Sequence, residues 1–135
     1  MDIMKIVVLR MFGHPINNFI RVNVICWNMS EIENILITGV SGFIGYNLAK
    51  YYLQKDGDIN IIGIDIVKSE RVNRLIKIKS ESNIFKFHLC DIKNKEKFNE
   101  TIKGIDVIFH LAGNANVVNG LKNPEVDLNE NLIRF

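Results

Sequence analysis

Most of the chain alternates between short apolar runs and amphipathic stretches, and this alternation constrains the fold more than any other feature. The apolar runs have the length of strands and lack polar positions on either face, which is typical of strands buried in a parallel sheet. A helix-type segment follows each run, so we predict an α/β protein with a parallel sheet and helices on both faces. The predicted strands are residues 34–38, 59–65, 84–91 and 105–113, and the predicted helices are residues 42–56, 69–79, 94–104 and 123–135.

Three glycines stand between the first predicted strand and its helix, in the sequence TGVSGFIG (Thr38–Gly45). A strand that turns directly into a helix brings the free N–H groups of the helix to the carboxyl edge of the sheet, where they can bind an anion. Gly39 suits the tight turn, Gly42 lets a pyrophosphate approach the backbone, and Gly45 permits close packing of helix on strand. The triplet alone also fits a purely structural turn.

An acidic residue at the end of the second predicted strand supports a dinucleotide. Asp65 lies 20 residues after Gly45, where a carboxylate would accept hydrogen bonds from the hydroxyls of an adenosine ribose. The same carboxylate repels a 2′-phosphate, which favours NAD over NADP. Lys68 and Arg71 follow closely and keep NADP as the less favoured alternative.

Composition excludes several classes of function. The 135 residues are 47% hydrophobic and 24% charged, with a net charge of +2, so neither a nucleic-acid nor a membrane-surface partner is indicated. No apolar run approaches the roughly 18–20 residues that a membrane helix needs, and the N-terminus lacks a signal-peptide cleavage site. Cys26 and Cys90 have no metal-type spacing, which fits a reducing cytoplasm and predicts no metal site.

The first 30 residues do not continue the alternation. They contain two β-prone runs around a Gly-His-Pro-Ile-Asn-Asn segment, for which a hairpin is one option. We therefore interpret residues 1–30 as an N-terminal extension and residues 31–135 as a partial NAD-binding domain.

Four sequence blocks together carry a resemblance to a known family. They are TGVSGFIG (Thr38–Gly45), GID (Gly63–Asp65), CDI (Cys90–Ile92) and VIFHLAGNANVVNGLKNPEVDLNEN (Val107–Asn131). In this order the blocks resemble the N-terminal part of the extended short-chain dehydrogenase/reductase family, the NAD-dependent epimerases and dehydratases of nucleotide sugars. The resemblance covers residues 33–135 and implies a Rossmann-like, doubly wound parallel sheet, truncated after about four strands.

The resemblance also implies which residues would contact the cofactor. His110, at the end of the fourth predicted strand, is interpreted as structural rather than catalytic. The implied cofactor-binding residues are Gly39, Gly42, Phe43, Ile44 and Gly45 at the pyrophosphate, Asp65 at the adenosine ribose, Asp91 and Ile92 at the adenine, and Leu111, Ala112 and Gly113 toward the nicotinamide ribose.

No catalytic residue is assigned in this chain. The family uses a Tyr-x-x-x-Lys pair, in which the lysine lowers the pKa of the tyrosine that exchanges a proton with substrate. Tyr46–Lys50 and Tyr51–Lys55 match this spacing, but both lie on the helix that runs away from the nicotinamide. The functional pair and the sugar-binding lobe are expected beyond Phe135.

The chain alone is therefore expected to be inactive, with a nucleotide sugar as substrate only if the missing half is supplied. The alternatives are a non-catalytic dinucleotide-binding or partner-binding module and a remnant without ligand.

The fourth predicted strand is expected to leave an unpaired edge. In the order 3-2-1-4-5-6 a fifth strand covers the fourth, and no such strand follows residues 105–113 in the predicted pattern. Exposed apolar edges promote association with other chains. We therefore expect a marginal fold and association through this edge or through the last helix.

Overall fold

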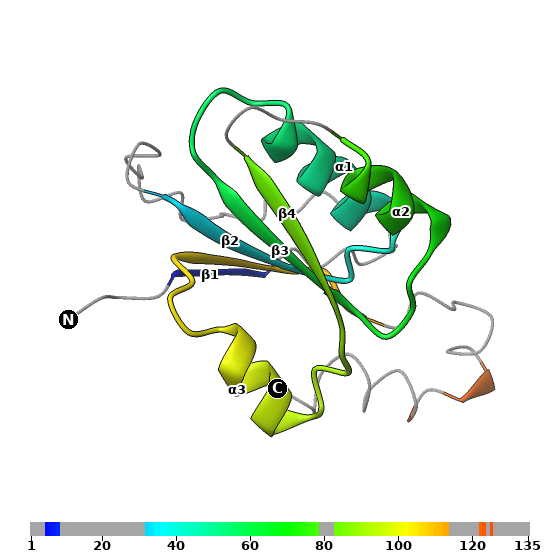
Figure 1. Cartoon of the computed structure of the whole chain (residues 1–135). Helices are drawn as coiled ribbons and strands as arrows, with labels where there is room; N and C mark the ends of the chain where they lie inside the picture. Colours follow the sequence, from blue (N-terminus) through cyan, green and yellow to red (C-terminus); the bar gives the residue numbers. More distant parts are fainter. Residues whose placement is uncertain (1–4, 9–31, 79–82, 114–121, 124, 126–135) are drawn as a thin grey trace, which may run out of the picture.

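The computed structural model describes residues 5–8, 32–78, 83–113, 122–123 and 125, which form one parallel sheet with helices packed on it (Figure 1). Five strands lie in the order β1-β5-β2-β3-β4, and all the pairings between neighbours are parallel. The strands are β1 (Lys5–Val8), β2 (Asn34–Thr38), β3 (Asn60–Asp65), β4 (Ile84–Leu89) and β5 (Val107–His110), and the helices are α1 (Phe43–Leu53), α2 (Glu70–Ile76) and α3 (Lys95–Thr101).

Helices cover both faces of the sheet, as the alternation predicts. Figure 1 shows α1 and α2 on one face and α3 on the opposite face. The Rossmann-like α/β class predicted from the sequence is confirmed. The helix predicted at residues 123–135 lies almost wholly outside the described residues. None of the helices in the described part is long and apolar enough to cross a membrane.

The prediction that the fourth strand of the repeating region has an unpaired edge is wrong. That strand is β5, and β1 pairs with it in parallel from Lys5↔Val107 to Val8↔His110. Part of the segment interpreted as an N-terminal extension, Lys5–Val8, thus supplies the strand at this edge. Sequence periodicity missed this pairing because it reports local structure, whereas β1 and β5 are distant in sequence. The boundary at residue 30 stays a prediction, since residues 9–31 lie outside the described part.

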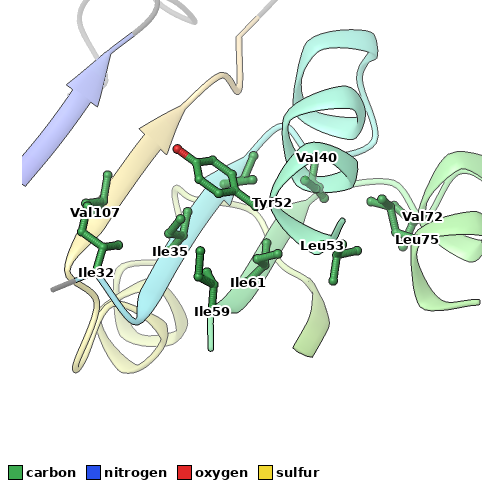
Figure 2. Packing of buried hydrophobic residues seen from close by; sticks show 12 residues of the cluster. Ile32, Ile35, Val40, Tyr52, Leu53, Ile59, Ile61, Val72, Leu75 and Val107 are labelled. Carbon is green, nitrogen blue, oxygen red and sulfur yellow. The ribbon is translucent and has the colours of Figure 1, made fainter. Parts of the chain in front are cut away.

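A hydrophobic core fills the space between the sheet and the first two helices (Figure 2). Ile35 and Ile61 rise from neighbouring strands, Tyr52 and Leu53 come down from α1, and Leu75 comes from α2. Removing such side chains from water stabilises a domain by about 1.5–3 kcal/mol each. This packing fixes α1 against β2 and thereby fixes the turn between them.

A smaller core lies under α3 on the other face of the sheet. Leu36, Ile64 and Ile108 are buried there, and Phe98 of α3 packs against them. Because β2, β3 and β5 point alternate side chains to opposite faces, each central strand contributes to both cores. This explains why these runs lack a polar face in the sequence.

Asn83 anchors the far end of α1. Its buried amide oxygen accepts from the Ile59 N–H at 2.8 Å, and its amide nitrogen donates to the carbonyls of Tyr52 at 3.0 Å and Lys55 at 2.6 Å. Carbonyls at the end of a helix have no partner within the helix, so this side chain stands in for a cap. One residue before β4 thus holds α1 in its place over β3.

Candidate functional site: the carboxyl edge of the sheet

The four repeating strands end side by side. Thr38 of β2 lies opposite both Ile64 of β3 and His110 of β5, while Asp65 lies opposite Leu89 of β4. The loops that follow these strands therefore meet at one edge. The first three sequence blocks predicted to bind the cofactor, and residues 107–113 of the fourth, are brought to this edge, which is where ligands bind in open α/β sheets.

The glycine turn has the geometry that the sequence predicts. Gly39 has a φ of +73°, and its N–H donates to the Ile64 carbonyl at 2.8 Å, so the chain turns sharply at the end of β2. A Cβ atom built at Gly39 would lie 2.7 Å from the backbone nitrogen of Ala112, and one at Gly45 would lie 2.4 Å from the Gly39 carbonyl oxygen. The chain thus turns tightly at Gly39, and Gly45 lets α1 approach the backbone of this turn closely.

The start of α1 is open to a ligand. Gly42 is the N-cap residue, no side chain hydrogen-bonds to the cap, and the first turn carries no acidic residue. The first N–H groups of a helix lack partners within the helix, and its N-terminus carries a partial positive charge. Gly42 and Ile44 are exposed, and Phe43 is 73% exposed. Among the described residues, the N–H groups at the start of α1 are therefore not capped by a side chain, as binding of an anion would require.

Asp65 is held against the glycine turn. Its carboxylate accepts from the Ser41 N–H at 2.9 Å through one oxygen and from the Val67 N–H at 3.3 Å through the other. The Ser41 hydroxyl donates to the Val67 carbonyl, which ties the same two loops together. Each carboxylate oxygen accepts one of these bonds and has a further lone pair, so the half-buried Asp65 can still accept from a ligand hydroxyl.

Basic and hydroxyl groups reach the same turn from α2. Arg71 Nη1 lies 3.3 Å from the Ser41 carbonyl oxygen, and Ser69 Oγ lies 3.4 Å from it. Both donate to this carbonyl, so the turn is braced from β3 and from the start of α2. Ser41 was not singled out from the sequence, although its place inside the glycine triplet was a usable signal.

The residues after β4 have separate tasks. Asp91 is exposed, and its Oδ1 accepts from the Lys93 N–H at 2.9 Å, which shapes the turn into α3. The side chain of Ile92 is half-buried and packs against the smaller core. The Cys90 N–H donates to the Asp65 carbonyl at 3.0 Å, so the loop after β4 is fixed beside the loop after β3.

Thr38 and His110 organise the loop after β5. Thr38 is fully buried, and its Oγ1 lies 2.8 Å from His110 Nδ1 while it accepts from the N–H groups of Leu111 at 3.1 Å and Ala112 at 3.2 Å. A hydroxyl that already accepts twice must donate its single proton to the third partner, so His110 Nδ1 is the acceptor and Nε2 carries the proton. The predicted structural role of His110 is supported by this geometry. The loop Leu111–Gly113 is thereby held over Gly39.

The structure places the two Tyr-Lys spacings on or just after α1. Tyr46 packs against the larger core, and Tyr51 is exposed with its ring edge-on to Tyr52 at a centroid distance of 5.3 Å. Burial raises the pKa of the Tyr52 hydroxyl above its ordinary value, and the neighbouring Tyr51 adds to this shift. These tyrosines thus contribute to the packing and surface of α1. Within the described residues, no group of three His, Cys, Asp or Glu side chains is arranged to hold a metal ion.

The sheet order, the glycine turn and the convergence of four loops define a Rossmann-like α/β protein. The sequence pattern of the NAD dependent epimerase/dehydratase family matches residues 35–134, and the chain belongs to this family.

Relatives in this family are about one third identical to this chain over the aligned residues. A UDP-glucuronate 4-epimerase of Thermodesulfobacterium geofontis is 33% identical over 104 residues, which are 72% of this chain and 31% of that protein. A dTDP-D-glucose 4,6-dehydratase of Dictyostelium discoideum is 36% identical over 94 residues, which are 67% of this chain and 21% of that protein. The chain thus spans a third or less of the length of these relatives.

Solved structures show the same fold. The UDP-glucose 4-epimerase of Thermotoga maritima, solved with UDP-glucose, superposes on this chain with a TM-score of 0.58 at 28% identity. The match covers 75% of this chain and 31% of the epimerase. The dTDP-glucose 4,6-dehydratase of Bacillus anthracis, solved in complex with NAD, gives a TM-score of 0.52 at 30% identity over 62% of this chain and 27% of the dehydratase.

Proposed function

We propose that this chain is the NAD-binding portion of an oxidoreductase of the nucleotide-sugar epimerase or dehydratase type. The observation that carries the proposal is the N-terminus of α1, which follows Gly42 and has no side-chain cap. This helix end lies at the carboxyl edge of the sheet, between the loop of Asp65 and the loop Leu111–Gly113. Family membership supports NAD dependence. A bound NAD would supply the hydride acceptor, and the residues of this chain would hold it.

The residues at the edge fit the parts of a dinucleotide. The N–H groups of Phe43 and Ile44 would bind the pyrophosphate, which Gly42 admits because it has no side chain. The carboxylate of Asp65, oriented by the Ser41 and Val67 N–H groups, would accept from the adenosine ribose. The other assigned contacts are Asp91 and Ile92 at the adenine, Gly39 and Gly45 within the turn, and Leu111, Ala112 and Gly113 toward the nicotinamide ribose.

Charge at the ribose position favours NAD over NADP. The Asp65 carboxylate lies where a 2′-phosphate would have to approach, and the two anions would repel each other. Arg71 reaches the turn, where its Nη1 donates to the Ser41 carbonyl at 3.3 Å. We therefore expect tighter binding of NAD, with NADP as the competing ligand to be measured.

Chemistry on a sugar would need groups outside those described. The proposal assigns binding and orientation to this chain and assigns proton transfer to a Tyr-x-x-x-Lys pair in the remaining part of the family's fold. The alternative is a module that binds a dinucleotide or a partner without catalysis. Addition of NAD and UDP-glucose to the chain should give no absorbance at 340 nm, and growth of that band would contradict the assignment.

Calorimetric titration with NAD and with NADP tests the binding proposal. Gly42→Ala is the informative variant, because a Cβ there meets the Gly39 carbonyl oxygen at 3.2 Å, which asks for a shift of a few tenths of an ångström, whereas a Cβ at Gly39 or Gly45 would lie within 2.8 Å of backbone atoms. Placed against the pyrophosphate, that methyl group should weaken NAD binding at least about tenfold, which corresponds to about 1.4 kcal/mol. Gln54→Ala at the opposite end of α1 serves as the matched control. Equal affinity in the two variants, or no heat with the parent chain, would contradict the proposal.

A further inference from the structure

The N-terminal strand occupies a place that the doubly wound order gives to another strand. β5 corresponds to the fourth strand of that order, and the strand next to it should be the one that follows it in sequence. Here the neighbour is β1, which precedes every other element of the sheet. It runs parallel to β5, as the following strand would, and pairs with all four residues of β5. The N-terminal segment thus stands where a later segment belongs.

β1 is a short strand at the border of the sheet. It has four residues, and within the described part of the chain its neighbour in the sheet is β5 alone. Residues 9–33 separate it from β2 in the sequence. A short strand at the edge of a sheet can leave its place and return without disturbing the remaining sheet. Figure 1 shows β1 at the border of the sheet, beside β5.

The edge beneath β1 matters for the candidate site. β5 contributes Val107 and Ile108 to the two cores and ends at His110, which with Thr38 holds the Leu111–Gly113 loop. An uncovered β5 would expose a row of unpaired backbone groups beside these apolar side chains. With β1 in place, β5 is paired on both sides, from Val107 to His110.

We propose that Lys5–Val8 is a surrogate edge strand, and that the outer edge of β5 is a docking site for one parallel strand, taken in this chain by its own N-terminus. One edge accepts one strand, so β1 and a following strand from the remainder of the family's fold would exclude each other. The proposal is independent of cofactor binding, because its test needs no NAD.

Proline substitutions in the full chain test the pairing. In a parallel strand successive residues direct their N–H groups to opposite sides, so one of Ile6 and Val7 donates toward β5 and the other points away. Proline removes the donor, and edge strands tolerate it where the N–H faces outward. Of Ile6→Pro and Val7→Pro, one should therefore accelerate hydrogen exchange of the β5 amides that face β1 at least about tenfold, and the other should change it little. Each variant is the control of the other.

A peptide supplied in trans tests docking. The nonapeptide of residues 2–10, DIMKIVVLR, added to the disrupting proline variant should restore slow exchange in β5, and a peptide with the same residues in scrambled order should not. A variant that dimerises and returns to monomer with the peptide would also support a strand-accepting edge. Unchanged β5 exchange in both proline variants, or equal effects of the two peptides, would overturn the proposal.

Discussion

Two glycines with the same backbone conformation allow us to measure how closely the glycine turn approaches the loop after β5. Gly39 and Gly104 both have a φ of +73°. Alanine at either position must enter the left-handed region, which costs about 1–2 kcal/mol. Their surroundings differ, because a Cβ at Gly39 would lie 2.7 Å from the Ala112 nitrogen and 2.8 Å from the Leu111 oxygen, whereas one at Gly104 meets no atom within 4 Å. The pair therefore separates backbone strain from close approach.

The expected magnitudes follow from this difference. Gly104→Ala should lower the free energy of unfolding by about 1–2 kcal/mol from strain alone. Gly39→Ala should lose the same amount plus about 1–3 kcal/mol, because the Leu111–Ala112 backbone must move away from the new methyl group. The total of about 2–5 kcal/mol is a large share of the roughly 5–15 kcal/mol that stabilises a typical domain.

Urea unfolding followed by far-UV circular dichroism measures both variants under one set of conditions. Equal m-values would show that the compared states are alike, so that a shift in midpoint reports stability. A loss in Gly39→Ala no greater than in Gly104→Ala would refute the conclusion that the glycine turn is pressed against the loop after β5. In the folded variants, NAD binding should fall with Gly39→Ala and persist with Gly104→Ala.

Three further predictions follow from named contacts. Thr38→Val should lower the free energy of unfolding by about 1–3 kcal/mol, since it removes the hydroxyl that pairs with His110 Nδ1 and the Ala112 N–H, while Thr38→Ser should retain most of the stability. Urea midpoints compare the two variants, and equal losses would contradict the hydroxyl's role. Asn83→Ala should lower the free energy of unfolding by about 2–4 kcal/mol, because the Ile59 N–H and the Lys55 carbonyl lose the Asn83 amide while the Tyr52 carbonyl keeps the Lys55 N–H. A loss under about 1 kcal/mol in the same assay would contradict this anchor. Because the pKa of Tyr52 is raised in the folded chain, this tyrosine ionises at a lower pH in the unfolded chain than in the folded one. The free energy of unfolding should therefore be full below about pH 10 and fall as the pH rises toward the folded-state pKa. Thermal unfolding of Tyr52→Phe should lack this part of the alkaline decline, and identical pH profiles of the variant and the parent chain would contradict it.

Local signals predicted much of the site. The alternation of apolar runs and helices predicted the class of fold, because buried parallel strands need apolar residues on both faces. The spacing of Gly39 and Gly45 predicted a turn whose geometry the structure confirms. Asp65 was placed correctly at the end of its strand, but its hydrogen bond with the Ser41 N–H depends on two loops meeting, which local periodicity does not report.

The contacts that sequence reasoning missed all join distant segments. Thr38 and His110 lie at the ends of separate predicted strands, and only the register between β2 and β5 places them opposite each other. The pairing of β1 with β5 crosses most of the described chain, and periodicity within either strand cannot report it. For this reason the predicted unpaired edge was wrong although the strand itself was correctly located.

By itself the sequence determined the succession of strands and helices, the turn at the glycines and the chemical groups at the strand ends, since each depends on near neighbours in the chain. Tertiary structure alone decided which strand covers β5, how Asp65 braces the glycine turn and how Thr38 and His110 hold the loop above it. These depend on sheet order and register, which are set by packing over the whole sheet.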